Sequence, residues 1–146
     1  MTENEVIKGV ENYLMQKGRT ENKRVRISAD AEKMQHGVDL AVNLGNNRYF
    51  IEAKGTVRSN GELMRSRFNT NFRWAISQII LRVATDSTNY ADIYAIAVPE
   101  NKIENCKKLI HENVALKMLK IRLFGAYRTE SGELFAKEYK PKDIYD

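Results

Sequence analysis

The sequence contains little cysteine, proline or tryptophan: one Cys, two Pro and one Trp in 146 residues. The single cysteine, Cys106, cannot form a disulfide within the chain, and no Cys/His cluster suggests a zinc site. Ile103, Cys106 and Ile110 recur at helical spacing, which predicts a small core residue at Cys106 rather than a nucleophile. Because no Pro-, Gly- or Ser-rich linker divides the chain, we expect residues 1–146 to form a single domain.

Long apolar runs are also missing. No stretch approaches the ~20 consecutive apolar residues that a transmembrane helix needs, so we expect no membrane span. The opening stretch MTENEVIKGVENYL carries acidic residues where a secretory signal has a basic start and an apolar block. Together these absences favour a cytoplasmic protein.

Positive charge is in excess, with 24 Lys and Arg against 19 Asp and Glu, a net charge of +5 and a pI near 9.3. This excess is compatible with a polyanionic partner but does not require one. The segment VRSNGELMRSRFNTNFR is especially rich in arginine, at positions Arg58, Arg65, Arg67 and Arg73. A guanidinium group can donate two hydrogen bonds to one phosphate, so the segment fits either a phosphate-binding loop or a solvated loop.

Apolar spacing predicts an alternation of helices and strands. Helices are expected over 3–17, 72–86 and 102–117, and strands over 24–28, 38–44, 48–54, 91–99 and 119–127. A short edge strand is possible within 129–139, and we expect the tail after Pro141 to be loose. The GNN at 45–47 is a strong hairpin signal between two strand-like runs. Strands interrupted by helices predict an α/β fold, a mixed central sheet with helices on both faces.

Residues able to perform chemistry gather at the end of this hairpin that lies away from the turn. Glu52 and Lys54 share one strand face, because side chains alternate along a strand. A turn at 45–47 predicts that Asp39 pairs near Lys54, with Glu52 about one residue pair nearer the turn. Two carboxylates suit Mg²⁺, which prefers hard oxygen ligands and keeps several waters. A lysine beside them can orient or deprotonate the attacking water. The pattern predicts a metal site, with ordinary charges at strand ends as the alternative.

Asp39, twelve intervening residues and then Glu52-Ala53-Lys54 resemble the active-site signature of the restriction-endonuclease-like PD-(D/E)xK nucleases. Val38 stands where the family signature has proline. The predicted order helix, three strands, helix, strand over about residues 3–98 is similar to the core of that fold. The resemblance implies a restriction-endonuclease-like core in which Asp39 and Glu52 bind metal, with the Ala53 carbonyl as a further ligand and Lys54 as the catalytic lysine.

The same resemblance implies supporting residues on two helices. Family members often add a glutamate from the first helix, for which Glu5 is the candidate and Glu11 the alternative. Recombination and resolvase nucleases carry a glutamine on the helix after the lysine strand, and Gln78 matches it. They have tyrosine four residues later, where this chain has Arg82. Arg82 lies on the same helix face as Gln78 and would contact phosphate.

The resemblance therefore implies an endonuclease that hydrolyses phosphodiester bonds in DNA with Mg²⁺, or with Mn²⁺ as a substitute. It also implies a homodimer or a subunit of a larger nuclease system. Duplex, single strand, junction and RNA all stay open as substrates. The residues expected to bind nucleic acid are Arg58, Arg65, Arg67, Arg73, Arg82 and His36.

Two other functions stay open. The chain can be a catalytically silent nucleic-acid-binding or assembly module with the nuclease fold, in which removal of Lys54 changes nothing. It can also be an unrelated α/β domain, and then Asp39 and Glu52 lie far apart or on opposite faces. Trp74 either stacks on a base or packs its helix against the sheet, and we expect the packing role.

Overall fold

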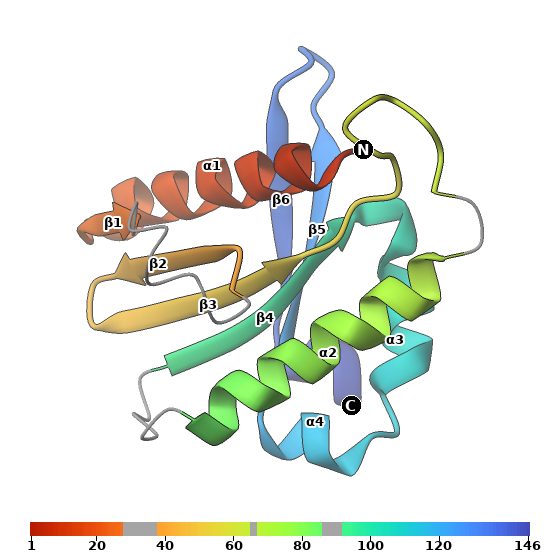
Figure 1. Ribbon diagram of the computed structural model, residues 1–146. Coiled ribbons are helices and arrows are strands. Elements are labelled where there is room, and N and C mark those ends of the chain that lie inside the picture. The colour runs from red at the N-terminus through yellow and green to blue at the C-terminus, as the bar shows by residue number, and fades with distance from the viewer. Residues whose placement is uncertain (28–37, 65–66, 86–91) are drawn as a thin grey trace.

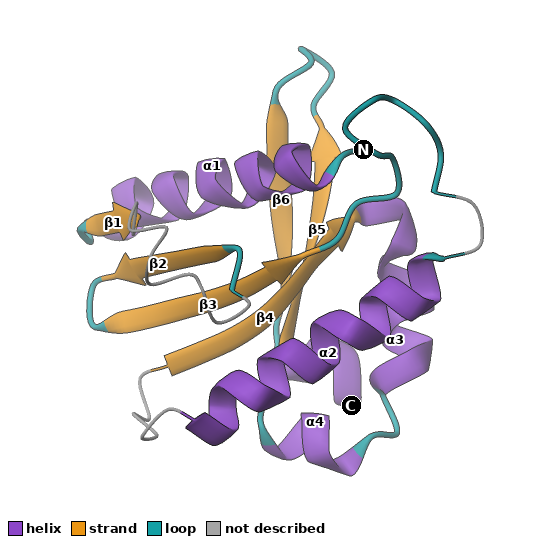
Figure 2. Ribbon diagram, in the orientation of Figure 1, coloured by secondary structure: helices purple, strands orange, loops and turns teal. Residues whose placement is uncertain are grey.

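A mixed six-stranded sheet organises the computed structural model, which describes residues 1–27, 38–64, 67–85 and 92–146 (Figures 1 and 2). The strands are β1 (Val25–Ile27), β2 (Leu40–Leu44), β3 (Asn47–Ala53), β4 (Asp92–Pro99), β5 (Arg122–Arg128) and β6 (Leu134–Tyr139), and they lie in this order across the sheet. β1, β2 and β3 pair antiparallel, β3, β4 and β5 pair parallel, and β6 returns antiparallel to β5. The predicted mixed sheet is confirmed.

Helices cover both faces of this sheet. They are α1 (Glu3–Glu21), α2 (Phe68–Thr85), α3 (Ile103–Ile110), α4 (Val114–Met118) and α5 (Pro141–Tyr145), with a 3-10 turn at Glu100–Lys102. On one face Val6, Val10 and Leu14 of α1 form a core with β2, β3, β4 and β5. On the other face the cluster contains α2, α3 and α5, and there Cys106 is fully buried. Burial raises the pKa of the Cys106 thiol to about 12, so this residue is a core residue as predicted. The α/β class is confirmed.

Three boundary predictions need correction. The first helix continues through Gly18 to Glu21 and ends at Asn22, whose φ of 52° is left-handed. The helix expected over 102–117 is broken, because the Asn113 side chain accepts a hydrogen bond from the Leu116 amide (3.0 Å) and starts α4 anew. The tail after Pro141 is ordered: Tyr145 is buried in α5, and its hydroxyl donates to the Ile121 carbonyl (2.9 Å). None of the described helices is long and apolar enough to cross a membrane.

A two-residue turn fixes the β2–β3 hairpin. Leu44 pairs with Asn47, so that only Gly45 and Asn46 lie between the strands. The φ of Gly45 is 59°, a value that glycine adopts without steric cost and that a two-residue hairpin turn needs at this position. The turn predicted at 45–47 is therefore one residue too long.

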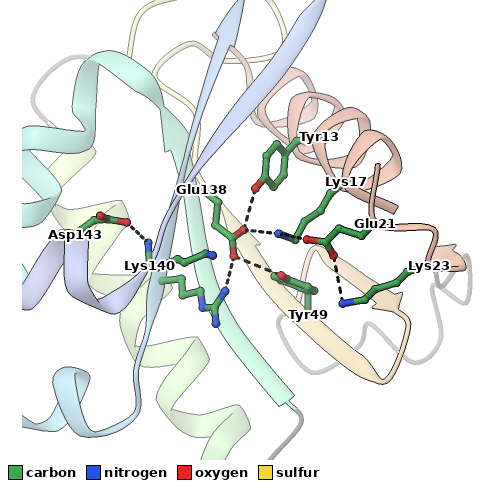
Figure 3. Close-up of polar contacts among 9 residues, drawn as sticks. Tyr13, Lys17, Glu21, Lys23, Tyr49, Glu138, Lys140 and Asp143 are labelled. Carbon is green, nitrogen blue, oxygen red and sulfur yellow. Dashed lines mark hydrogen bonds and ion pairs between the residues drawn. The ribbon is translucent and has the colours of Figure 1, made fainter. Parts of the chain in front are cut away.

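One buried carboxylate ties α1 to the sheet. The Glu138 side chain, on β6, is 1% exposed and accepts hydrogen bonds from Arg122 (2.6 Å), Tyr13 (3.0 Å) and Tyr49 (3.4 Å). Lys17 of α1 lies 4.0 Å from the same carboxylate, and Figure 3 shows Tyr13, Lys17 and Tyr49 pointing towards it. Burial, and then the charge of Glu138, raise the pKa values of both tyrosines, so their hydroxyls stay protonated and donate.

We expect Glu138→Ala to lower the free energy of unfolding by about 3–5 kcal/mol, because it leaves the Arg122 cation without its partner in the α1–sheet interface. Urea denaturation followed by circular dichroism measures the loss. Glu133→Ala, in the exposed turn of the same hairpin, is the matched control and should change stability by no more than about 0.5 kcal/mol. Equal losses in the two variants would contradict the role of Glu138.

Candidate functional site

The end of the hairpin brings Asp39 close to Glu52, and the Asp39 N–H donates to the Ile51 carbonyl at 3.1 Å. Leu40 pairs with Ile51, and Asp39 directly precedes Leu40. The prediction that Asp39 pairs near Lys54 is wrong, because the turn has two residues rather than three. The Asp39 carboxylate accepts a hydrogen bond from the Ala53 backbone N–H at 2.7 Å. This bond continues the contact between the strands beyond β2 and holds the carboxylate at the end of β3.

Glu52 is a buried acid with one unpaired oxygen. Its residue is 2% exposed, and Oε1 accepts a hydrogen bond from the Lys54 ammonium at 2.9 Å. Oε2 is buried and has no hydrogen-bond partner among the described residues. Burial, and then the negative charge of Asp39, raise the pKa of Glu52 to about 7, while the bond from Lys54 offsets part of this rise. The site is therefore short of positive charge near neutral pH.

Lys54 supplies the cation of this group. Its side chain is 18% exposed, and burial by itself lowers its pKa. The hydrogen bond and charge of Glu52, with the charges of Glu3 and Asp39, outweigh burial and raise the pKa above its usual value. Lys54 is therefore an ammonium at neutral pH, suited to orient a water or hold a phosphate oxygen.

The structure brings Glu3, rather than Glu5, to this group. Burial, and then the charge of Asp39, raise the pKa of Glu3, and the charge of Lys54 partly opposes them. Glu5 instead exchanges hydrogen bonds with Thr2 in a capping box (2.8 and 3.2 Å). It also pairs with Arg128 across the α1–β5 contact.

A sequence signal for this arrangement was present. The opening TENE has Thr followed three residues later by Glu, the pattern of a capping box, and this pattern marks Glu5 as part of a helix cap. Glu11, the alternative, forms an ion pair with Lys8 at 3.8 Å. Neither residue is therefore needed to explain the carboxylate group at the hairpin end.

Gly55 lets the start of α1 approach the hairpin end. A Cβ on Gly55 would lie 2.6 Å from the Glu3 nitrogen and 2.7 Å from the Thr2 carbonyl carbon, closer than real Cβ atoms come to backbone. The N–H groups of Thr56 and Val57 donate to the Met1 carbonyl at 2.9 and 3.2 Å. The chain leaving Lys54 thus holds the first turn of α1, and with it Glu3, beside the acidic pair.

Gln78 and Arg82 lie on the flank of α2 that faces β3. α2 connects two parallel strands, so it runs opposite to β3 (Figure 1). The Arg82 guanidinium lies 4.7 Å from the centre of the Phe50 ring. Phe50 is on β3, two residues before Glu52. Gln78 is one helical turn nearer to the Glu52 end, and its Oε1 is buried without a hydrogen-bond partner among the described residues. The supporting role of Gln78 stays a prediction.

Of the arginines predicted to bind phosphate, Arg58 lies beside Glu3, and Arg67 is exposed just before α2 begins. Arg58 is exposed and lines a pocket of about 350 Å³ between the start of α1 and the turn at 56–64, which also includes Glu3 and Gly55. That turn is ordered, since the Arg58 N–H donates to the Glu62 carbonyl at 2.8 Å.

Three other predictions have different outcomes. Arg73 lies one turn after Asn69, whose side chain accepts a hydrogen bond from Asn105 of α3 (2.8 Å), so Arg73 follows the flank that faces away from β3. His36 and Arg65 lie outside the described residues.

Trp74 does not pack α2 against the sheet, and that prediction is wrong. The residue is 66% exposed. Phe72, Ala75 and Ile79 make the contact instead, with exposures of 0, 0 and 1%. Their three- and four-residue spacing leaves Trp74 on the neighbouring flank.

The donor set fits a hard divalent cation. Over the described ranges, no group of three or more His, Cys, Asp or Glu side chains is placed to hold a metal ion. Mg²⁺ is commonly held by one or two carboxylates together with waters and substrate phosphates, so Asp39 and Glu52 are sufficient donors for it. The unpaired Oε2 of Glu52 is a buried acceptor that such a cation would satisfy. A structural zinc site, which needs four protein ligands, does not fit.

A larger pocket of about 990 Å³ lies elsewhere, between α1 and the β5–β6 hairpin. Its lining includes Lys8, Arg19 and Arg128, but none of Asp39, Glu52 and Lys54. The acidic pair with its lysine therefore remains the better candidate for chemistry.

Comparison of the chain with models of protein families, with curated proteins and with solved structures found no match in any of the three. The functional argument therefore rests on the side chains gathered at the end of the β2–β3 hairpin.

We expect the metal-free protein to lose stability as the pH rises from about 4.5 to about 7, because folded Glu52 holds its proton more tightly than the unfolded chain does. The contribution is complete below pH 4.5 and is lost as the pH passes 7, and it amounts to at most about 3 kcal/mol. Glu3 adds to it with the same sign. Urea denaturation in EDTA at a series of pH values measures it.

Glu52→Gln should remove most of this decline, since the amide does not titrate. Glu112→Gln changes a side chain that is 88% exposed and should keep the wild-type decline. A Glu52→Gln protein with the full wild-type slope would show that the buried acid lies elsewhere.

Proposed function

We propose that this chain is a Mg²⁺-dependent endonuclease of the restriction-endonuclease-like PD-(D/E)xK type that hydrolyses phosphodiester bonds in DNA. The observation that carries the proposal is the buried Glu52 carboxylate with its unpaired oxygen, close to Asp39 and bonded to Lys54. Such a group is costly to a fold unless a cation completes it. The spacing of the three residues in the sequence matches the signature of that nuclease family.

Each residue has a role that its surroundings support. Asp39, held by the Ala53 N–H, and Glu52 would hold Mg²⁺ or Mn²⁺, with the Ala53 carbonyl as a further ligand. When bound, the ion supplies Lewis acidity, which makes an attacking water more acidic and offsets charge on the phosphodiester. Lys54 orients that water or holds a phosphate oxygen as an ammonium. Gln78 and Glu3 position these groups from α2 and α1.

Arginines around the site would bind the nucleic-acid backbone. Arg58, Arg67 and Arg82 lie on the elements that border the carboxylate pair. Contacts to phosphate give salt-dependent affinity without reading sequence. The proposal includes a cytoplasmic location and assembly as a homodimer or as a subunit of a larger nuclease system, both of which come from the family resemblance.

One observation favours the silent alternative. Among the described residues no three carboxylates are placed to hold a metal ion together, and the Glu52–Lys54 ion pair already neutralises part of the acidic pair. A nucleic-acid-binding module without catalysis would tolerate this arrangement. Cleavage assays separate the two functions.

We expect the protein to cut supercoiled plasmid or a labelled single strand in Mg²⁺ or Mn²⁺ and not in EDTA. Lys54→Ala should reduce the rate by at least about 100-fold, because the ammonium at the reacting group is lost. Lys8→Ala, whose side chain is 60% exposed on α1, is the matched control and should cut at the wild-type rate.

Cutting that survives in Lys54→Ala would point to a contaminating nuclease or to another site. Binding without cutting by any of these proteins would support the silent module instead.

We expect Glu3→Ala to lower the cleavage rate about tenfold with little change in the unfolding midpoint, as for residues that orient metal ligands. Glu5→Ala should do the opposite: it removes a helix cap worth about 1 kcal/mol and keeps the cleavage rate. Thermal unfolding and plasmid cleavage are measured on both variants. A Glu5→Ala protein that folds normally but cuts poorly would return Glu5 to the site.

A further inference from the structure

One flank of α2 carries a continuous row of polar and aromatic side chains. The row is Arg67, Asn71, Trp74, Gln78 and Arg82, spaced three or four residues apart, so its members follow one another along the helix. Both ends of the row are arginines, and the indole lies at its centre. Such a row presents a ring between two cations.

This row, referred to as the α2 ridge, lies on the side of α2 that faces β3, the strand that carries Glu52. Arg82 lies over Phe50 of β3, which fixes the direction of the ridge. The opposite flank faces α3, since Asn69 and Asn105 are hydrogen-bonded there. Because α2 runs opposite to β3, Trp74 is one turn beyond Gln78, towards the end of β3 where Lys54 lies (Figure 1).

Trp74 is exposed without a stacking partner. The residue is 66% exposed, and within the described residues its indole makes no ring or cation–π contact. The exposed indole therefore offers a flat face on which a base can stack.

The charge of the helix selects the kind of ligand. α2 carries Arg73 and Arg82 and no Asp or Glu, and Arg67 directly precedes it. Aromatic rings between cationic side chains bind single strands, since bases stack on the ring while arginines contact phosphates. In a duplex the bases are already stacked on each other, and only the phosphates can reach the ridge.

We propose that Trp74 stacks an unpaired base and that the substrate strand on the α2 ridge is single-stranded. The inference rests on the proposed function, because that function supplies a nucleic acid as the substrate. It narrows the choice among duplex, single strand and junction to substrates with unpaired bases beside the scissile bond. Arg67 and Arg82, at the two ends of the ridge, would contact phosphates further along the same strand.

Trp74 is the single tryptophan of the chain, so its fluorescence reports on this position alone. An oligothymidine strand titrated in EDTA should quench this fluorescence, because stacking on a base quenches an indole. A long blunt-ended duplex at the same nucleotide concentration, in which nearly all bases are paired, should leave the fluorescence nearly unchanged. EDTA prevents cutting, so binding is measured whether or not the protein is a nuclease.

Variants identify the contact. Trp74→Leu should weaken binding of a labelled strand about tenfold, the scale of losing one stacked base, while Trp74→Phe keeps most of the affinity. Ile80→Ala, 39% exposed on the flank of α2 that also carries Arg73, is the matched control and should bind like the wild type. These positions are exposed, so the variants should fold.

Equal quenching by the duplex, or no quenching by the strand, would overturn the proposal. So would wild-type affinity in Trp74→Leu. An equal loss in Ile80→Ala would also overturn it, because the loss would then not be specific to the ridge. Quenching without cleavage in Mg²⁺ would contradict the proposed nuclease activity and support the stacking site. Cleavage without quenching would support the nuclease activity and contradict the stacking site.

Discussion

The two-residue turn at Gly45 and Asn46 is the constraint on which the site depends. It sets the register of β2 against β3, and a slip of one residue would turn the side chains of a whole strand to the other face. In the observed register Asp39 meets the last residues of β3, where the Ala53 N–H binds its carboxylate. The hydrogen bonds between the strands therefore hold the carboxyl groups of Asp39 and Glu52 close together although each disfavours the charge of the other.

Glu52 and Glu138, the two buried glutamates among the described residues, differ in how fully their surroundings satisfy them. Glu138 has an arginine, a lysine and two tyrosine hydroxyls around it, so both of its oxygens are satisfied and α1 is fixed to the sheet. In Glu52, Oε1 accepts a hydrogen bond from Lys54, whereas Oε2 has no hydrogen-bond partner among the described residues. A buried carboxylate whose oxygens all accept hydrogen bonds stabilises the fold. A buried carboxylate with an unpaired oxygen can still bind a cation. The first arrangement positions α1, and α1 in turn carries Glu3 to the second.

The sequence and the structure agree where the signal is local. Alternation along 38–54 predicted the hairpin, and apolar spacing predicted α2 and the buried strand that became β4, because each pattern depends on neighbours a few residues apart. The errors arose where distant contacts decide. Trp74 is apolar and lies in an apolar helix, yet Phe72, Ala75 and Ile79 occupy the sheet-facing positions and leave it in solvent. The Pro141 tail was expected to be loose, but Tyr145 is fixed by the Ile121 carbonyl of a distant segment.

The sequence by itself determined the residue types and spacing of Asp39, Glu52 and Lys54, the strand faces they occupy and the alternation of helices and strands. These follow from chain geometry, which each residue shares with its neighbours. Only the tertiary structure decided that Glu3 joins the group and that Glu5 binds Arg128, and that the α2 ridge presents Trp74 towards the site. Those outcomes depend on how α1 and α2 dock on the sheet, and docking is set by close contacts such as Gly55 against the first turn of α1. Such contacts join residues far apart in the chain, so no local pattern encodes them.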